Sequence, residues 1–260
     1  MNELTSNFFF QLVCADLYHV SQPSVCRIIS EVSEIVASHI RRYIKFPTNQ
    51  ETLNQMRVNF FQQGGFPGVI GLVDGTHIPI KSPGGDNAEV FRNRKTFFSL
   101  NVQIVAGPHE EILDIVVRWP GSAHDSRIFD NSGVRVRLSE GHLPGHLLGD
   151  SGYPQREYLY TPVPQAGNRA EMNYNIAHRR TRSTVERTIG RWKRRFPCLY
   201  FELQNKLRNI TRIITACAVL YNIGIQGRDL WEVEELEERR EIIEIPVAPL
   251  PENARGAEIR

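Results

Sequence analysis

Three consecutive stretches in the middle of the chain have the apolar and polar patterns of β-strands. "GVIGLVDGTHIPI" (68–80) is rich in β-branched residues and bounded by Gly and Pro, "FFSLNVQIVAG" (97–107) alternates, and "EILDIVVRWPG" (111–121) alternates after a short turn. A period of two is typical of strands with one buried face. Because the connections are short, the pattern predicts three adjacent strands in an antiparallel meander.

Helical spacing follows these strands. We expect a helix beginning near His124, a short strand "HLLGD" (146–150), Pro- and Gly-rich loops, and a long helix from about Thr181 to Arg195. An apolar stripe at helical spacing predicts the packed face of the long helix: Val185, Ile189, Trp192 and Phe196. Three strands, a helix, a strand and a helix form the order of the ribonuclease H-like fold, an α/β fold with a mixed sheet flanked by helices.

The N-terminal part is helical in pattern. Residues 8–40 predict two helices, and Ser21 is a suitable N-cap for the second, with Pro23 in its first turn. The apolar positions of this second helix are Val25, Ile28, Ile29, Val32, Ile35 and Val36. The arrangement resembles a helix-turn-helix, whose second helix enters the DNA major groove. A helical hairpin that caps the main domain fits the same pattern. A connector with one helix near 50–62 follows.

Composition limits the class of protein. The chain has 260 residues, 41% of them hydrophobic, and a formal net charge of +2, which describes a globular chain able to bury a full core. Its four cysteines are scattered and form no Cys-x-x-Cys pair, so we expect a reducing compartment. The longest apolar run is far shorter than the ~20 residues of a membrane span. No membrane partner is therefore expected.

The near-neutral total hides two charged segments. Residues 179–195 contain eight Arg or Lys and one acid, Glu186, which gives a local charge of 8 − 1 = +7. An acidic tract at 232–244 and a Pro-containing terminus lie at the other end of the chain. A charge run is usually a solvated face, but a helix with this many cations also fits a phosphate backbone. A second basic group consists of Arg92, Arg94 and Lys95. Its sequence is consistent both with phosphate contacts and with a surface that merely faces water.

Asp74 interrupts the first strand with a carboxylate among small and apolar residues. An isolated ionised carboxylate in an apolar layer costs several kcal/mol unless it is paired, hydrogen-bonded or bound to a metal. In the ribonuclease H-like order, acids from the first strand, the fourth strand and a late helix converge at one edge of the sheet. Asp74, Asp150 and Glu186 stand at those three places, with 186 − 150 − 1 = 35 residues between the last two.

Each acid also has a structural explanation. Asp74 could accept hydrogen bonds from the turn that follows it, and Asp150 could begin the turn of "DSGYP". Glu186 could form a surface ion pair with an arginine of its own helix. Asp125 could be a favourable charge at a helix start.

Three histidines are weaker candidates for chemistry. His142 and His146 have the spacing of a helical zinc pair, but Gly and Pro surround them. His77, three residues after Asp74, is better explained as support for the strand than as a metal ligand. We therefore predict no zinc site from these residues.

A family resemblance becomes specific at the motifs around these acids. They read "VIGLVDGTHIPIKSP", "NRKTFFSLNVQIV", "WPGSAHDSRIF", "LLGDSGYP" and "MNYNIAHRRTRSTVERTIGRWKRRFPCL". Together with a looser match at "SQPSVCRI" they cover about two thirds of the chain. In order and content they resemble the PIF/Harbinger-type DDE transposases, and most of all the transposase-derived nucleases of animals.

The resemblance implies a site and an activity. Asp74, Asp150 and Glu186 would be catalytic and would bind a divalent cation, Mg²⁺ or Mn²⁺, with Asp125 as a fourth metal ligand. The implied reaction is hydrolysis of DNA phosphodiester bonds by a two-metal mechanism. We expect phosphate contacts from two basic groups: Arg92, Arg94 and Lys95, and Arg182, Lys193 and Arg194.

Four segments and three functions are consistent with these patterns. We expect a helix-turn-helix-like segment (1–45), a connector (46–68), a DDE ribonuclease H-like catalytic domain (69–224) and an acidic, Pro-containing tail (225–260). Members of the resembled family usually carry more chain before the helix-turn-helix. A nuclear location is expected, with the cytoplasm as a second one, and a protein partner could supply DNA recognition or nuclear import. The alternatives to a nuclease are an active Harbinger-type transposase and a domesticated DNA-binding or adaptor protein without cleavage activity.

Overall fold

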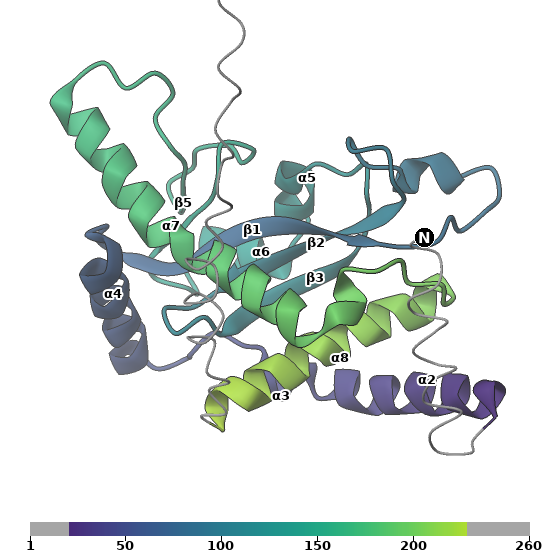
Figure 1. Cartoon of the computed structure of the whole chain (residues 1–260). Helices are drawn as coiled ribbons and strands as arrows, with labels where there is room; N and C mark the ends of the chain where they lie inside the picture. The colour runs from purple at the N-terminus through teal and green to yellow at the C-terminus, as the bar shows by residue number, and fades with distance from the viewer. Residues whose placement is uncertain (1–20, 228–260) are drawn as a thin grey trace, which may run out of the picture.

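A five-stranded mixed sheet forms the centre of the computed structural model, which describes residues 21–227 (Figure 1). Its strand order is β3-β2-β1-β4-β5. The bounds are β1 Val69–Pro79, β2 Ser99–Ala106, β3 Ile112–Pro120, β4 His146–Leu148 and β5 Leu159–Tyr160. β1, β2 and β3 form the expected antiparallel meander, and β4 and β5 run parallel to β1. The predicted α/β class with a ribonuclease H-like mixed sheet is confirmed.

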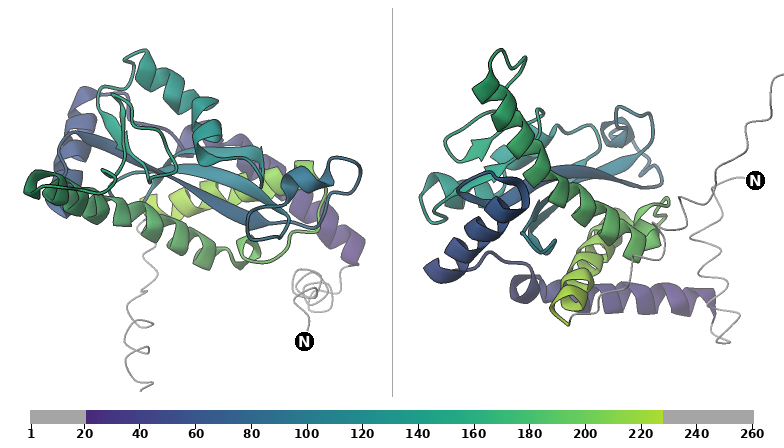
Figure 2. Two further views of the ribbon diagram at one scale, coloured as in Figure 1. Left: turned by 90° about the horizontal axis from the view of Figure 1, so that it is seen from above. Right: turned by 60° about the vertical axis from the view of Figure 1, so that its left-hand side comes forward.

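Helices cover both faces of the sheet, as the left view of Figure 2 shows. α7 (Arg169–Arg195) and α8 (Leu207–Gln226) lie on one face, where Val185, Trp192 and Ile214 join the larger apolar cluster. α5 (Asp125–Asp130) and α6 (Gly133–Ser139) cover the other face with a second cluster around Phe129 and Leu138. Each face of β2 and of the first half of β1 is thereby buried, which explains the near-continuous apolar start of β1; the polar residues of the alternating strand β2, Ser99, Asn101 and Gln103, are buried as well.

The remaining elements surround this sandwich. α4 (Gln50–Gly64) packs against α7 and β1 and matches the helix expected near 50–62. Two short 3₁₀ helices, η2 (Ala88–Phe91) and η3 (Pro197–Leu199), lie in the connections before β2 and α8. Of the described helices, none is long and apolar enough to cross a membrane.

The N-terminal helical segment packs on α8 and the main core of the molecule. α2 (Gln22–Ser38) begins after Ser21, as predicted, lies along α8 and leads into α3 (Ile40–Tyr43). Ile29 and Val36 pack against the main core, whereas Ile28, Val32 and Ile35 are exposed. The helix expected before Ser21 lies outside the described residues, so the helix-turn-helix stays a prediction.

Three elements differ from the sequence expectations. α7 begins at Arg169 instead of near Thr181, with Asn168 accepting a hydrogen bond from the Glu171 amide as N-cap. Its first turns project beyond the sheet edge and lack a continuous apolar stripe, which is why the pattern did not reveal them (Figure 1). β5 and α8 were not predicted, because β5 is two residues long and the short apolar run inside α8 fits a buried strand equally well.

One buried amide ties three elements together. The Asn222 side chain on α8 accepts a hydrogen bond from the Ile112 amide (2.9 Å) and donates to the Ile112 and Tyr43 carbonyls (2.7 and 2.8 Å). These contacts satisfy backbone groups where β3 begins and where α3 ends. α8 is thereby fixed against both the sheet and the N-terminal segment.

Asn222→Ala is expected to lower the free energy of unfolding by about 2–4 kcal/mol, because three hydrogen bonds are lost and two buried carbonyls and one amide lose their partner. Chemical denaturation measures this change. Ile223→Ala, at a partly exposed position of the same helix, should cost less than about 1 kcal/mol. Equal losses in the two variants would contradict the role given to Asn222.

Candidate active site

Strand register places two of the predicted acids side by side. β1 and β4 are parallel, and their last registered pair is Leu72 with Leu148. Asp74 and Asp150 each follow that pair by two residues, so they lie at the same level along the two strands. β4 has ended there, and the Asp150 Oδ1 accepts a hydrogen bond from the Gly152 amide (2.9 Å). Asp74 therefore lies within β1, which continues to Pro79, beside the point where β4 ends and Asp150 follows it.

Asp125 approaches the same point from α5. A Cβ added to Gly75 would lie 2.3 Å from the Asp125 Oδ1, so only glycine lets this carboxylate come so close to β1. The Asn101 side chain on β2 donates a hydrogen bond to the same oxygen (2.8 Å) and another to the Ala123 carbonyl (2.9 Å). Asp125 is thus held against β1, close enough for its charge to act on Asp74, and it is more than a charge at a helix start.

Glu186 reaches the site through an arginine. The Arg182 guanidinium donates to the Asp74 Oδ2 through Nη2 (2.8 Å) and to the Glu186 Oε1 through Nη1 (3.0 Å). Asp74 and Arg182 have side chains only 15% and 16% exposed, whereas Glu186 is 61% exposed. Arg182 is therefore the counter-ion of the buried aspartate, and Glu186 lies on its outer side.

The three aspartates share one electrostatic environment. The pKa of Asp74 is raised to about 6, chiefly by burial and also by the charges of Asp150 and Asp125, against the opposing effects of Arg182 and the Gly75 amide. Burial also raises the pKa of Tyr153 well above its usual value, with added contributions from Asp125, Asp74 and Asp150. The acids repel one another here, and a cation would relieve that repulsion.

The donor atoms suit a hard divalent cation, but the set is not closed. Carboxylate oxygens are the ligands that Mg²⁺ and Mn²⁺ prefer, and Asp74, Asp125 and Asp150 supply them from three different elements. Between residues 21 and 227, however, no three His, Cys, Asp or Glu side chains stand close enough to hold an ion as they are placed. Because Arg182 lies between Asp74 and Glu186, these two acids have to lose that contact before they could share a metal. The residues thus fit a metal once the guanidinium moves.

Several of the predicted phosphate contacts lie beside these acids. The Lys193 Nζ donates to the His77 carbonyl on β1 (2.8 Å), and burial followed by the charge of Lys95 lowers the pKa of Lys193 to about 8. The pKa of His77 is lowered by burial, while Asp125 raises it and Lys193 and Lys95 lower it. Lys95 and Lys193 therefore stand together at the margin of the acidic site, and His77 supports the strand between them.

The other basic residues differ in what they contact. Arg94 lies against the imidazole of His124, with its Nη2 3.0 Å from Nδ1. Arg92 is committed to Glu89 and covers the ring of Phe98. Arg194 is exposed on α7. Their contacts with DNA stay predictions.

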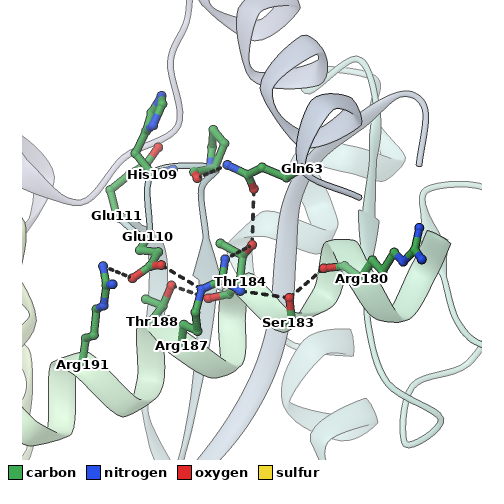
Figure 3. A network of polar contacts seen from close by, with 11 residues as sticks. Gln63, His109, Glu110, Glu111, Arg180, Ser183, Thr184, Arg187, Thr188 and Arg191 are labelled. Atoms are coloured by element: carbon green, nitrogen blue, oxygen red, sulfur yellow. Dashed lines mark hydrogen bonds and ion pairs between the residues drawn. The ribbon is translucent and has the colours of Figure 1, made fainter. Parts of the chain in front are cut away.

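A clamp between the β2–β3 turn and α7 escaped the sequence analysis. Glu110, in a left-handed backbone conformation (φ 64°), accepts from the Arg187 Nε (3.0 Å) and the Arg191 Nη1 (2.8 Å), as Figure 3 shows. The Thr184 hydroxyl on α7 donates to Gln63 of α4, which itself donates to the Pro108 carbonyl. These contacts fix the middle of α7, which carries Arg182 and Glu186, against the β2–β3 turn and α4. Two arginines of the basic segment are thus used for structure.

A pocket of about 300 Å³ adjoins the acids on the open side of α7. Its lining includes Arg182 and Glu186, and beyond them Pro162, Asn175, Ile176, His178 and Arg179. Its far wall is fixed, because the Asn175 side chain pairs with both backbone groups of Val163 (2.8 and 3.0 Å) and the Tyr174 hydroxyl donates to the Thr161 carbonyl. Substrate could therefore reach Arg182 and Glu186 without opening the fold.

Comparison with known proteins assigns this arrangement to a family. The sequence model of the DDE superfamily endonuclease family matches residues 73–222, the stretch that contains Asp74, Asp125, Asp150 and Glu186. This chain belongs to the DDE superfamily of endonucleases. The Harbinger-type resemblance is confirmed as well, because the human protein named "Putative nuclease HARBI1" is 33% identical over 227 residues, which are 85% of this chain and 65% of the human protein.

More distant relatives of this DDE family member occur in plants. The Arabidopsis thaliana "Protein ALP1-like" is 24% identical over 84% of this chain and 57% of its own length. "Antagonist of like heterochromatin protein 1" from the same plant is 22% identical over 82% of this chain. The chain spans about 65% of the length of the HARBI1 proteins. No solved structure matches it.

Asp74→Asn is expected to stabilise the metal-free protein at pH 7 by up to about 3 kcal/mol and to change little at pH 4. A carboxyl whose pKa is raised by folding, here from 3.8 to about 6, contributes stability below pH 4 that is lost as the pH rises through 6. Asparagine cannot ionise and avoids that loss. Denaturation with a chelator present, at both pH values, measures it.

Asp130, which pairs with Arg156 at the surface, provides the control for this comparison. Asp130→Asn should show no gain at pH 7. If Asp74→Asn gained nothing at pH 7 relative to pH 4, the buried, repelled state of Asp74 would be refuted.

Proposed function

We propose that the protein is a divalent-metal-dependent nuclease that hydrolyses DNA phosphodiester bonds, with Asp74, Asp150 and Glu186 as its catalytic acids. The observation that carries this proposal is the placement of Asp74 on β1 beside the point where the parallel strand β4 ends and Asp150 follows, with Asp125 against Gly75 and Glu186 tied to Asp74 through Arg182. The endonuclease family match covers these acids and supports the same reading.

The chain's own residues prepare the site for such a reaction. Asp74, Asp150 and Asp125 concentrate negative charge that binds a cation, and Glu186 completes the set from the helix. Bound Mg²⁺ or Mn²⁺ ions would activate the attacking water and neutralise charge on the phosphorus centre, as in two-metal nucleases. The polar neighbours Asn101 and Gly152 hold two of the carboxylates in place.

Cations around the acids would position the DNA backbone. Beyond Arg182, which contacts two of the acids, Lys95 and Lys193 lie beside His77 together with Asp125, and Arg94 and Arg194 extend the positive surface. Phosphate contacts of this kind fix orientation and carry no sequence information. DNA as substrate also agrees with a nuclear location, and a separate protein partner could supply sequence recognition.

An adaptor protein without cleavage activity is the second candidate. One plant relative carries a name that describes antagonism of another protein, not cleavage, and Arg182 holds the acids away from a closed metal set. An active transposase would use the same acids as the nuclease. The adaptor is distinguished by experiment as follows.

Purified protein should cleave supercoiled plasmid in the presence of Mg²⁺ or Mn²⁺, and Asp150→Asn should lower the rate by at least ~100-fold. The substitution keeps the shape of the side chain and removes one charge from the metal site. DNA affinity without metal should stay level or rise, because repulsion of phosphate is relieved. Asp130→Asn is the control and should cleave at the parent rate. Absence of metal-dependent cleavage in the parent would favour the adaptor.

Replacing both Lys95 and Lys193 with Ala should weaken DNA binding similarly for unrelated sequences. The slope of log affinity against log salt concentration should fall by an amount that corresponds to about two phosphate contacts. Fluorescence anisotropy over a range of salt concentrations measures both effects. The control pair is Lys81→Ala and Lys206→Ala, because these two substitutions remove the same charge and both lysines line a different pocket. An unchanged salt slope after the first pair of substitutions would remove these lysines from the interface.

A further inference from the structure

Arg182 makes contacts that compete directly with metal binding. The Asp74 Oδ1 accepts the Gly75 amide (2.9 Å), and the Oδ2 accepts the Arg182 Nη2 (2.8 Å). The second oxygen is therefore the one that a metal would have to take from the guanidinium. The same guanidinium holds the Glu186 Oε1. One cationic side chain thus holds two of the three acids that the proposed function needs.

This pairing satisfies a real electrostatic need in the absence of metal. Asp74 is buried and lies in the field of Asp150 and Asp125. A buried carboxylate that loses its only counter-ion is strongly destabilised. A divalent cation could meet the same need, so the arginine and the ion are alternatives for one position.

The structure also provides room for the guanidinium to leave. Arg182 and Glu186 line the pocket of about 300 Å³ whose far wall is fixed by the hydrogen bonds between the Asn175 side chain and the Val163 backbone. The Arg182 Nε is buried and has no hydrogen-bond partner among the described residues, so turning the side chain breaks only its two ion pairs. Arginine suits phosphate oxygens because its planar fork offers paired donors.

We infer that Arg182 is a positioning residue that holds Asp74 and Glu186 as their counter-ion until a divalent cation replaces it, and then turns into the adjoining pocket to bind a DNA phosphate. This inference rests on the proposed function, because it assumes that the acids bind metal. Metal and DNA binding are then linked through one side chain, and each strengthens the other by the same factor.

Titration calorimetry of Mn²⁺ into the full chain without DNA tests the competition. Arg182→Gln should bind Mn²⁺ at least about 10-fold more tightly than the parent, because the ion no longer competes with the guanidinium charge for Asp74 and Glu186. Coupling between neighbouring charged sites commonly changes an affinity by a factor of this size. Arg179→Gln is the matched control: it removes the same charge from the same pocket, one turn away, where no ion pair with the acids is formed. It should bind Mn²⁺ within about 3-fold of the parent.

Arg182→Lys keeps the charge but cannot bridge two carboxylates, and it serves if Arg182→Gln fails to fold. It should bind Mn²⁺ more tightly than the parent and less tightly than Arg182→Gln. A merely structural arginine would leave Mn²⁺ affinity unchanged or lower it in these variants. Mn²⁺ affinity equal to the parent's in whichever variants fold would overturn the inference.

A DNA titration tests the second half of the inference. Anisotropy of a short fluorescent duplex should show that Ca²⁺, a hard oxygen-binding cation, raises the DNA affinity of the parent about 5-fold or more. The gain should be largely lost in Arg182→Gln and kept in Arg179→Gln. An equal gain in all three proteins would overturn the transfer of Arg182 to phosphate.

These outcomes separate the inference from the proposed function. If neither the parent nor Arg182→Gln binds Mn²⁺, the metal site itself is refuted and the inference falls with it. If Mn²⁺ binds tightly to Arg182→Gln but no protein cleaves DNA, the nuclease is refuted while the role of Arg182 stands.

Discussion

The ion pair between Asp74 and Arg182 is the interaction on which the rest of the site depends. Its carboxylate, that of Asp74, lies on the central strand β1, beside the point where the neighbouring strand β4 ends. Two further aspartates lie near the same point, so the carboxylate could not remain there without a cation. The requirement for a cation joins the sheet, α5 and α7 into one site.

The scaffold around this pair is arranged to keep α7 at a fixed position. Glu110 at the β2–β3 turn holds two arginines of the helix, and Thr184 is hydrogen-bonded to α4. On the other side, His178 is hydrogen-bonded to the Tyr160 carbonyl of β5, and Asn175 to the backbone of Val163 that follows β5. Between these two anchors lie Arg182 and Glu186, whose side chains are the parts of α7 free to exchange partners. A rigid helix with one exchangeable ion-pair network suits a site that accepts a metal.

Much of this could be predicted from the sequence, and the reasons are local. Alternating strands, short turns and an apolar run interrupted by Asp74 are enough to give the meander and its buried acid, and "LLGD" places Asp150 at the end of a strand. Arg182 was expected to contact DNA phosphate, because the sequence of a basic helix gives the charge of each side chain but not the neighbour toward which it points. Its contact with Asp74 depends on tertiary packing between residues far apart in the chain. The Glu110 clamp was missed for the same reason, and the start of α7 because its first turns bury little apolar surface.

Asp74, Asp150 and Glu186 would form a divalent-metal site in which Arg182 is the counter-ion until a metal ion binds. Anomalous X-ray diffraction from crystals of the full chain soaked with Mn²⁺ tests it most directly, because the signal locates the ion without reference to activity. We expect an anomalous peak beside Asp74 and Asp150, with the Arg182 guanidinium displaced from the carboxylates of Asp74 and Glu186. A structure in which Mn²⁺ binds elsewhere, while Arg182 keeps its contacts with Asp74 and Glu186, would contradict it.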